Sequence, residues 1–430
     1  MNFTPDLLLA LILLSALTTI ALTLARPAYA RIAALVGMAI FLFAWLVART
    51  ALPITSAAAS APGAWPHWTW QIGELSWSLS LAILLLTLGA LALSRGPVSP
   101  LLIQLLASTA LLACWAGNFA TYVLAWTLLA GVWLAAVLWH RRQVEDHDPL
   151  TLRNTVSLPL AAVLLLWLAA STAGPQASLE TAASDAVVWS TLTRSLVLIA
   201  ASFQLLVFPF YLWRAYRHAP PPLAALLHAA PAAAGALLLS RLESASDIGL
   251  AFALPFTLVG LLALLVGARR AWIAASGDAT LPVSLILAQS GLLLLAAIWA
   301  GPQAILGESA VLLLAGGVLL LAYDQNITFQ NVRALQPGPL LALAALAATP
   351  LTAGFTGRSA TYDAWLDGGR WLLVLTTALL HVPLLVAALK TVLPQTSNDE
   401  GPSPTLSLTA PTSPNLARLA ALLLPAIRLF

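Results

Sequence analysis

Four ionisable side chains and one hydroxyl group lie inside or beside apolar runs that are long enough to cross a bilayer. These candidates for an ion path are His228, Arg358, His381, Glu308 and Thr127. Imidazole and carboxylate groups can pass protons on, and a guanidinium can hold a carboxylate or a water molecule in place. Because an ionisable group in hydrocarbon is costly unless it is paired or lines a cavity, their placement indicates either an ion path or a packed polar contact.

Each candidate also has a purely structural interpretation. His228 and His381 would then be neutral histidines that hydrogen-bond to neighbouring helices, and Arg358 would extend towards lipid headgroups. Glu308 lies close to the end of an apolar run, where we expect it to meet water. Residue types alone leave both interpretations open.

Prolines and glycines beside these residues predict interrupted helices. Residues 208–235 read FPFYLWRAYRHAPPPLAALLHAAPAAAG, and residues 350–358 read PLTAGFTGR. A proline at membrane depth frees a backbone carbonyl, so it is tolerated mainly where the helix lines a cavity or packs against protein. The residues expected to break helices are Pro220, Pro222, Pro231, Gly235, Pro350 and Gly354.

The elements that must position these residues are membrane-spanning helices. The chain has 430 residues, of which 60% are hydrophobic and 8% are charged, and its mean hydropathy is +0.92. About 13 runs approach the roughly 20 apolar residues that one crossing needs. They lie near residues 5–25, 31–49, 77–94, 100–116, 119–139, 156–173, 190–213, 221–240, 248–267, 281–300, 304–323, 336–355 and 371–391. The fold class is an all-α polytopic membrane protein, because continuous Leu- and Ala-rich runs lack the alternation of barrel strands.

The arginines predict the orientation of the helices. Basic residues in short loops are retained on the cytoplasmic side, and the loops after odd-numbered runs contain more of them. Those residues are Arg26, Arg31, Arg95, Arg141, Arg142, Arg153, Arg214, Arg217, Arg269, Arg270 and Arg333, against Arg49, Arg194, Arg241, Arg358 and Arg370 on the other side. We therefore expect an integral protein of a prokaryotic inner membrane, with its N-terminus outside, its C-terminus in the cytoplasm and its first run retained as a helix.

Composition also predicts the domain organisation. Residues 1–393 form one transmembrane domain, residues 394–414 form a flexible cytoplasmic linker rich in Pro, Ser and Thr, and residues 415–430 form a short amphipathic helix. The net charge of +3 is spread over loops, which favours contact with anionic lipid and not with nucleic acid. With a single cysteine, Cys114, and no nucleotide or cluster motif, we expect no catalytic residue, cofactor or metal site on this chain.

Three stretches in a fixed order resemble a known family. They are residues 118–129 (NFATYVLAWTLL), residues 208–241 and residues 350–358. The chain resembles the antiporter-like, proton-conducting membrane subunits of respiratory complex I, which also occur in membrane-bound hydrogenases, Mrp-type antiporters and two-component inorganic-carbon transporters. The likeness covers about residues 70–390. Agreement with the family's motifs is carried by Phe208, Pro209, Trp213, Ala219, Pro220, Pro222, Ala225, Leu226, Leu227, His228, Ala229 and Ala230, and later by Pro350, Thr352, Gly354 and Phe355.

The resemblance implies an architecture and a set of departures from it. The family is built from two inverted repeats of five helices, each with one broken helix, so we expect breaks around Pro231 and Pro350. Family members pair a glutamate with a lysine, but Thr127 follows Trp126 where the glutamate would stand, and residues 232–234 are alanines where the lysine would stand. Arg358 replaces a further lysine. The chain is therefore expected to be a divergent member without the usual Glu and Lys.

Several functions remain open at this stage. The first is a membrane subunit of a complex I-like assembly, of the NADH–quinone or hydrogenase type, that acts as a degenerate proton channel with conduction reduced or lost. A scaffold subunit that keeps only the packing is the variant of this function without conduction. The alternatives are a membrane subunit of an inorganic-carbon uptake system and an unrelated secondary transporter. The expected partners are lipid and the other membrane subunits of a redox-driven or carbon-uptake complex. Any redox chemistry belongs to the partners.

Overall fold

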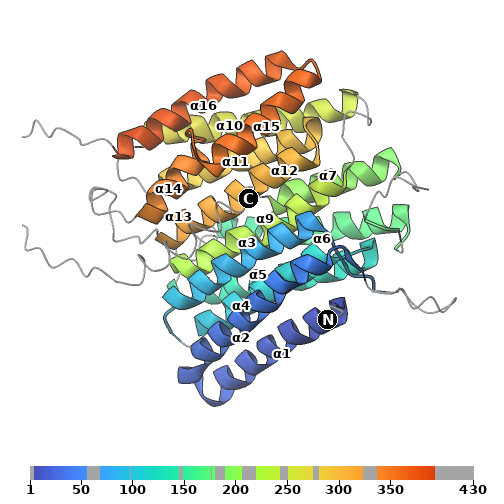
Figure 1. The fold of residues 1–430 in the computed structure, drawn as a ribbon, viewed down its shortest axis with the longest axis vertical. Helices are drawn as coiled ribbons and strands as arrows, with labels where there is room; N and C mark the ends of the chain where they lie inside the picture. The colour runs from blue at the N-terminus through green and yellow to red at the C-terminus, as the bar shows by residue number, and fades with distance from the viewer. Residues whose placement is uncertain are drawn as a thin grey trace, which may run out of the picture.

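The computed structural model describes residues 4–55, 68–96, 98–144, 149–175, 177–179, 189–205, 219–242, 250–274, 280–322 and 337–392. These residues form a bundle of helices and one two-stranded antiparallel sheet (Figure 1). The predicted linker at 394–414 and the predicted helix at 415–430 lie outside the described residues. The all-α fold class predicted from the apolar runs is confirmed.

The first part of the chain contributes six long helices, a short 3₁₀ turn and the small sheet. Their bounds are α1 (Pro5–Ala25), α2 (Pro27–Ala48), η1 (Arg49–Ala51), β1 (Ile54–Thr55), β2 (Gln71–Ile72), α3 (Glu74–Leu93), α4 (Val98–Trp115), α5 (Phe119–Val144) and α6 (Pro149–Ala173). Ile54 pairs with Ile72 in the sheet. Prolines begin α1, α2 and α6, where a missing N–H leaves no helical hydrogen bond unmade.

The second part of the chain holds the shorter and interrupted elements. Their bounds are α7 (Thr191–Gln204), α9 (Pro221–Arg241), α10 (Leu250–Ile273), α11 (Thr280–Trp299), α12 (Pro302–Ala310), η3 (Val311–Ala315), α13 (Gly316–Ala322), α14 (Pro337–Leu346), α15 (Ala353–Asp367) and α16 (Trp371–Val392). The helices α12 and α13 form one span, and η3 between them is a π-helical turn. Such turns inside helices often accompany functional sites.

Eleven helices in the described ranges are long and apolar enough to cross a membrane, so the chain is an integral membrane protein. The two expected runs that do not appear among them are 190–213 and 336–355. The first is represented by α7, which has only 14 residues, and residues 206–218 lie outside the described part of the chain. The second is divided between α14 and the start of α15.

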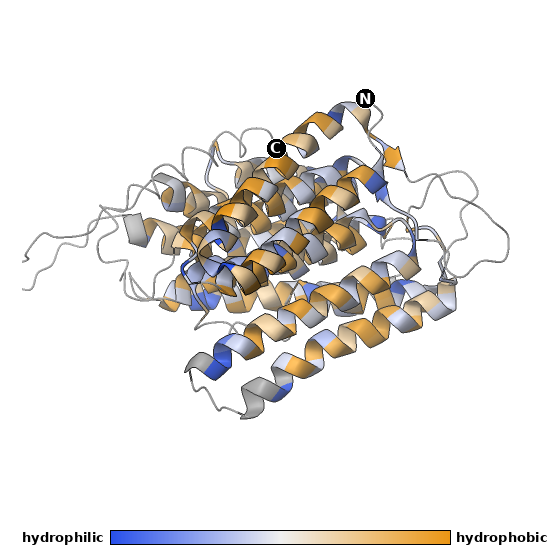
Figure 2. Ribbon diagram, turned by 90° about the horizontal axis from the view of Figure 1, so that it is seen from below, coloured by the Kyte–Doolittle hydropathy of each residue, from blue (hydrophilic) through white to orange (hydrophobic). Residues whose placement is uncertain are grey.

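The bundle has a buried centre, and the helices at its two ends expose apolar residues. The helix pair α1 and α2 lies at one end of the long axis and α16 lies at the other, with α9 and α13 between them (Figure 1). Almost every residue of α9 and α11 is buried, whereas α1, α6 and α16 leave most of their apolar residues on the outside. Apolar residues accordingly cover the outer helices as well as the core (Figure 2), which is the pattern of a protein solvated by lipid.

The expected break at Pro231 is not present, because α9 continues through this residue. A proline inside a helix frees the carbonyl four residues earlier, which here belongs to Leu227. The indole Nε1 of Trp133 on α5 donates to this carbonyl over 2.8 Å. Because a neighbouring helix supplies the missing donor, Pro231 is accommodated without an interruption.

The other residues expected to break the first helix have different roles. Pro220 is the N-cap of α9, and Pro222 lies in its first turn, so both residues mark the beginning of the helix. Gly235 lies within α9 and faces α7, where a Cβ atom would come within 3.0 Å of the Gln204 Cβ. Gly235 therefore allows two helices to pack closely.

The second interruption lies between α14 and α15, where residues 347–352 are not helical. Ala348 and Leu351 have positive φ angles of 46° and 70°, which are uncommon for residues with a side chain. The Thr352 hydroxyl accepts from the Phe355 N–H and begins α15. At Gly354 a Cβ atom would collide with the Ala345 carbonyl oxygen, so only glycine lets the two helix ends lie this close.

Candidate functional site

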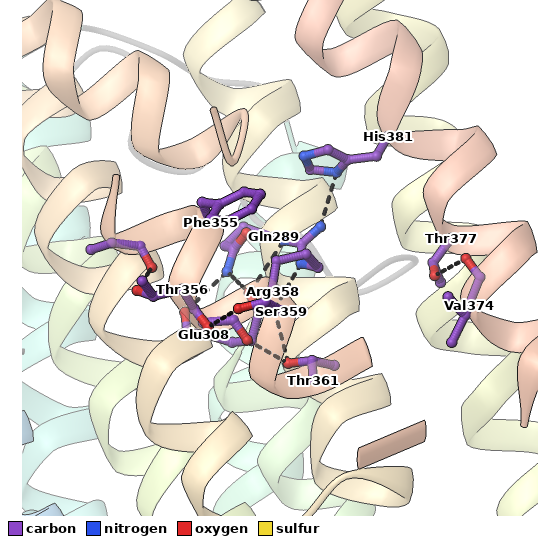
Figure 3. Close-up of polar contacts among 12 residues, drawn as sticks. Gln289, Glu308, Phe355, Thr356, Arg358, Ser359, Thr361, Val374, Thr377 and His381 are labelled. Atoms are coloured by element: carbon purple, nitrogen blue, oxygen red, sulfur yellow. Dashed lines mark hydrogen bonds and ion pairs between the residues drawn. The ribbon is translucent and has the colours of Figure 1, made fainter. Parts of the chain in front are cut away.

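Four helices, α11, α12, α15 and α16, bring polar side chains together next to this interruption (Figure 3). The closest approach is between α12 and α15, where a Cβ atom on Gly307 would come within 2.8 Å of the Gly357 Cα. The residues that follow these two glycines are Glu308 and Arg358. The pair of glycines thus lets the backbones approach until a glutamate and an arginine from different helices can meet.

Glu308 and Arg358 form a buried ion pair. Arg358 Nε lies 2.8 Å from Glu308 Oε1, and Arg358 Nη2 lies 3.2 Å from Glu308 Oε2. Glu308 has no exposed surface, and Arg358 is 4% exposed. Two parallel charge-assisted hydrogen bonds give this pair a fixed geometry. The expectation that Glu308 meets water is therefore wrong for this structure. Of the two interpretations of Arg358, the structure shows a buried polar contact and not exposure to headgroups.

Two uncharged residues that the sequence did not single out complete the hydrogen bonding of the pair. Gln289 on α11 donates from Nε2 to Glu308 Oε2 over 2.5 Å and accepts at Oε1 from Arg358 Nη2 over 3.1 Å. The Thr361 hydroxyl lies 3.1 Å from Glu308 Oε1. Glu308 Oε2 therefore has two donors, while Oε1 accepts from Arg358 Nε and shares the single Thr361 hydroxyl proton with the Gly357 carbonyl oxygen, 2.9 Å from that hydroxyl. These hydrogen bonds offset part of the hydration lost on burial.

His381 on α16 joins the pair to the interrupted backbone. Its Nδ1 lies 2.9 Å from Arg358 Nη1, and its Nε2 lies 2.9 Å from the Ala347 carbonyl oxygen. A guanidinium can only donate and a carbonyl can only accept. His381 must therefore be neutral, with its proton on Nε2. Glu308, Arg358 and His381 form one continuous chain of hydrogen bonds that ends at the helix break.

His228 lies apart from this cluster, in the middle of α9. The ring is buried, and the backbone of Leu312 in the π-helical turn accepts a hydrogen bond from it. Its Nε2 atom has no hydrogen-bond partner in the described part of the chain. A Cβ atom on Gly316 would come within 3.6 Å of this nitrogen, so the ring packs against a glycine. No hydrogen bond joins His228 to the Glu308 cluster within the described ranges.

Thr127 lies outside any polar cluster. Its side chain is on the exposed face of α5, and its hydroxyl donates to the Val123 carbonyl of the same helix over 2.7 Å. Threonine hydroxyls in membrane helices are commonly satisfied in this way. Thr127 therefore lies on the outer surface of the bundle.

A second polar group that the sequence did not indicate connects α5, α7 and α9. The Tyr122 hydroxyl lies 2.9 Å from the Ala234 carbonyl oxygen and 3.0 Å from the side-chain amide of Gln204. The Gln204 contact is through Oε1, so both neighbours of the hydroxyl are acceptor oxygens, and its single proton is donated to one of them at a time. This cluster is buried and has no formal charge.

The two polar regions can therefore support different chemistry. The Glu308 cluster holds one negative and one positive charge beside a neutral imidazole, so opening the ion pair would expose a carboxylate that can accept a proton. The Tyr122 group contains no such carboxylate. In the described residues, His, Cys, Asp and Glu side chains do not gather in groups of three that could hold a metal ion.

Comparisons with solved structures place this fold beside membrane subunits of large complexes. It is similar to a chain of respiratory complex I from Thermus thermophilus with bound aureothin, with a TM-score of 0.75 and 19% identity, over 97% of this chain and 96% of that one. It is similar to a chain of the Mrp complex from Dietzia sp. DQ12-45-1b, with a TM-score of 0.73 and 16% identity, over 89% of this chain and 78% of that one.

A third similar chain belongs to the membrane-bound sulfane sulfur reductase, an archaeal respiratory membrane complex. The TM-score is 0.73 and the identity is 18%, over 97% of this chain and 74% of that one. No protein-family profile and no curated protein sequence matches the chain. At these identities the likeness establishes a shared fold, which is the fold of subunits in multi-subunit membrane respiratory complexes.

Proposed function

We propose that this chain is a membrane subunit of a complex I-like ion-translocating assembly and that it moves protons through its second half only. The observation that carries the proposal is the buried Glu308–Arg358 ion pair, linked through His381 to a helix break. Charged groups at membrane depth are rare and usually belong to ion pathways. The similarity of the fold to subunits of respiratory complexes supports the same conclusion.

The residues of the cluster have distinct roles in this proposal. Glu308 is the proton-accepting group, and Arg358 holds its carboxylate by two hydrogen bonds while the pair is closed. His381 offers Nδ1 as a proton acceptor only when Arg358 moves away from it, since the guanidinium occupies that lone pair in the closed arrangement. Proton arrival at His381 and closure of the Arg358–His381 contact therefore exclude each other. This competition makes the cluster a gate for protons.

The first half is proposed to be the degenerate part. Thr127 and alanines 232–234 occupy the positions where the family resemblance places a glutamate and a lysine. Three buried polar groups of this half, Tyr122, Gln204 and His228, include no carboxylate that could exchange a proton with a cation. Conduction is therefore reduced to one of two possible routes. The chain supplies no redox chemistry in this proposal, which assigns that step to partner subunits.

The location and orientation complete the proposal. The chain lies in a prokaryotic inner membrane with its N-terminus outside, as the distribution of arginines favours. Its neighbours are other membrane subunits of the assembly.

Proton flux into liposomes tests the proposed route. The purified chain is reconstituted with a pH-sensitive dye inside the vesicles, and a potassium gradient with valinomycin supplies the driving force. We expect Arg358→Met and His381→Ala to reduce the flux to that of empty vesicles, while His228→Ala leaves most of it. Arg153→Met, which removes an exposed arginine, is the matched control. Equal flux in the parent and in the Arg358 and His381 variants would exclude the cluster from any ion path.

Purification in mild detergent tests the assembly. We expect quinone- or hydrogenase-type subunits to co-purify with the chain. A large soluble zinc protein in their place would favour the inorganic-carbon uptake system, and a clean monomer would favour an independent secondary transporter. Either of these two results would overturn the proposed assembly.

A further inference from the structure

The helix break lies beside the middle of α16, one of the candidate membrane spans. His381 is the eleventh of the 22 residues of α16, a helix that is long enough to cross the membrane. Its ring is hydrogen-bonded to the Ala347 carbonyl, the first residue after α14. The segment 347–352 is therefore about as far from one membrane surface as from the other.

This segment is exposed on the outside of the bundle. The Leu351 side chain is 102% exposed, and Phe355 at the start of α15 is 46% exposed. Within the described residues, the Leu351 N–H and the carbonyls of Pro350 and Leu351 have no hydrogen-bond partner. An exposed apolar side chain and backbone groups without a partner thus occur at the same point of the segment.

Neither lipid nor water suits both features of this surface. Acyl chains offer no hydrogen bonds, and lipid-exposed irregular backbone does not occur in the hydrocarbon region of membrane proteins. Water would satisfy the backbone groups, but it would leave the Leu351 and Phe355 side chains solvated. Protein is the one surrounding that provides hydrogen bonds and apolar contact together.

We propose that a transmembrane helix of a neighbouring subunit covers the surface formed by Pro350, Leu351 and Phe355. This inference rests on the proposed function, which assigns the chain to a multi-subunit assembly. The partner helix presents a pocket between small residues for the Leu351 side chain. Beside that pocket it carries a serine, threonine, asparagine or glutamine that bonds to the Leu351 N–H. Such small and hydroxyl-bearing positions are the usual means of close helix contact in membranes.

The covering helix also explains why a strained backbone persists. Leu351 has a φ of 70°, a conformation that its side chain disfavours. Strained residues remain where surrounding contacts hold them, and the side chain of Leu351 has none within the described chain. In the assembly, insertion of this side chain into a partner supplies those contacts. The neighbouring subunit would then hold the backbone whose Ala347 carbonyl receives the His381 proton.

Site-directed photo-crosslinking in native membranes tests the interface. The single cysteine, Cys114, is buried and is replaced by alanine. Leu351→Cys is then labelled with benzophenone maleimide and irradiated in the membranes of the producing cells. Leu164→Cys on α6, where the leucine is 69% exposed, is the matched control. We expect one discrete adduct with a membrane subunit from Leu351→Cys, and lipid adducts alone from Leu164→Cys. Phe355→Cys provides a second site on the same surface.

Other outcomes would overturn the interface. Lipid adducts alone at positions 351 and 355 would do so, as would an adduct confined to the chain itself. Rapid labelling of Leu351→Cys by a membrane-impermeant thiol reagent would indicate water and would exclude the covering helix.

The two proposals can fail separately. Proton flux that depends on Arg358, without a crosslink, would leave the proposed route standing and remove the interface alone. A crosslinked subunit together with flux that is insensitive to Arg358→Met would keep the interface and remove the route.

Discussion

The two halves of the bundle treat the same problem, a proline at membrane depth, in opposite ways. Around Pro231 the helix is continuous, because Trp133 from α5 bonds to the carbonyl that the proline frees. Around Pro350 the helix is interrupted, and His381 from α16 bonds to the Ala347 carbonyl at the break. The buried Glu308–Arg358 ion pair lies beside the interrupted site. The two sites differ in the donor that the neighbouring helix supplies. It is an indole N–H beside the continuous helix and an imidazole N–H beside the interrupted one.

The donors themselves differ in what they can do. An indole N–H has a single state at any pH near neutrality, so the Trp133 contact is permanent. An imidazole exists in two tautomers and a charged form, so the His381 contact depends on where its protons are. The first half is thus fixed by its hydrogen bonds, while the second half contains a hydrogen bond that can change.

The largest effect is expected from removing one charge of the buried pair. Arg358→Met leaves Glu308 buried without a counterion, and we expect a loss of about 3–5 kcal/mol in the free energy of unfolding. The double variant Arg358→Met with Glu308→Gln should recover much of this loss but none of the proton flux. Thermal unfolding of the detergent-solubilised protein measures both. Equal stability of the single and double variants would mean that Glu308 and Arg358 do not form a buried ion pair.

A smaller effect is expected from separating the helices that hold the pair. Gly357→Val places a side chain against Gly307, and overpacking of this kind costs about 1–3 kcal/mol. Proton flux should fall as well, because α12 and α15 can no longer approach closely enough for Glu308 to meet Arg358. Gly131→Val, at a position where a Cβ atom meets nothing within 4 Å, is the control. Equal stability of the two variants would contradict the close approach.

The first half can be tested by a double-mutant cycle. Trp133→Phe leaves the Leu227 carbonyl without a donor, which costs about 1–3 kcal/mol. Pro231→Ala restores the backbone N–H that can bond to this carbonyl. We therefore expect Trp133→Phe to destabilise the parent more than it destabilises the Pro231→Ala variant. Additive losses in the cycle would mean that the indole does not compensate for the proline.

The smallest effect is expected at the uncharged group of the first half. Tyr122→Phe removes the hydroxyl that bridges Gln204 and the Ala234 carbonyl, at a cost of about 1 kcal/mol. The proton flux of the vesicles should remain at the parent value. A loss of flux comparable with that of Arg358→Met would place an ion path in the first half and would remove the contrast between the two regions.

Sequence reasoning located the membrane spans and most of the ionisable residues of the site. It predicted the wrong environment for Glu308. The apolar run was expected to begin at residue 304, close to Glu308, but α12 already begins at Pro302 and places this residue in its second turn. It missed Gln289, since an amide in an apolar run looks the same as the amides of Gln104 and Gln204 elsewhere. It also predicted a break at Pro231, because the indole that prevents it lies 94 residues away in the chain.

The helix α15 shows a further limit of reasoning from hydropathy. Its residues include Thr356, Arg358, Ser359 and Asp363, so no apolar run marks it. The helix forms because Thr352 caps its start and because α12 packs against its glycine-containing face. Contacts of this kind depend on the tertiary structure and cannot be located from one sequence.

The π-helical turn at residues 311–315 sets the rotational phase of the span that contains it. Each residue of an α-helix advances the side-chain direction by about 100°, and the wider turn changes this advance between Glu308 and Gly316. Deleting a single leucine from this turn would rotate one end of the span relative to the other. Glu308 could then no longer point towards Arg358 while Gly316 packs against His228. The number of residues in the π-helical turn therefore fixes the relative orientation of the two ends of this span.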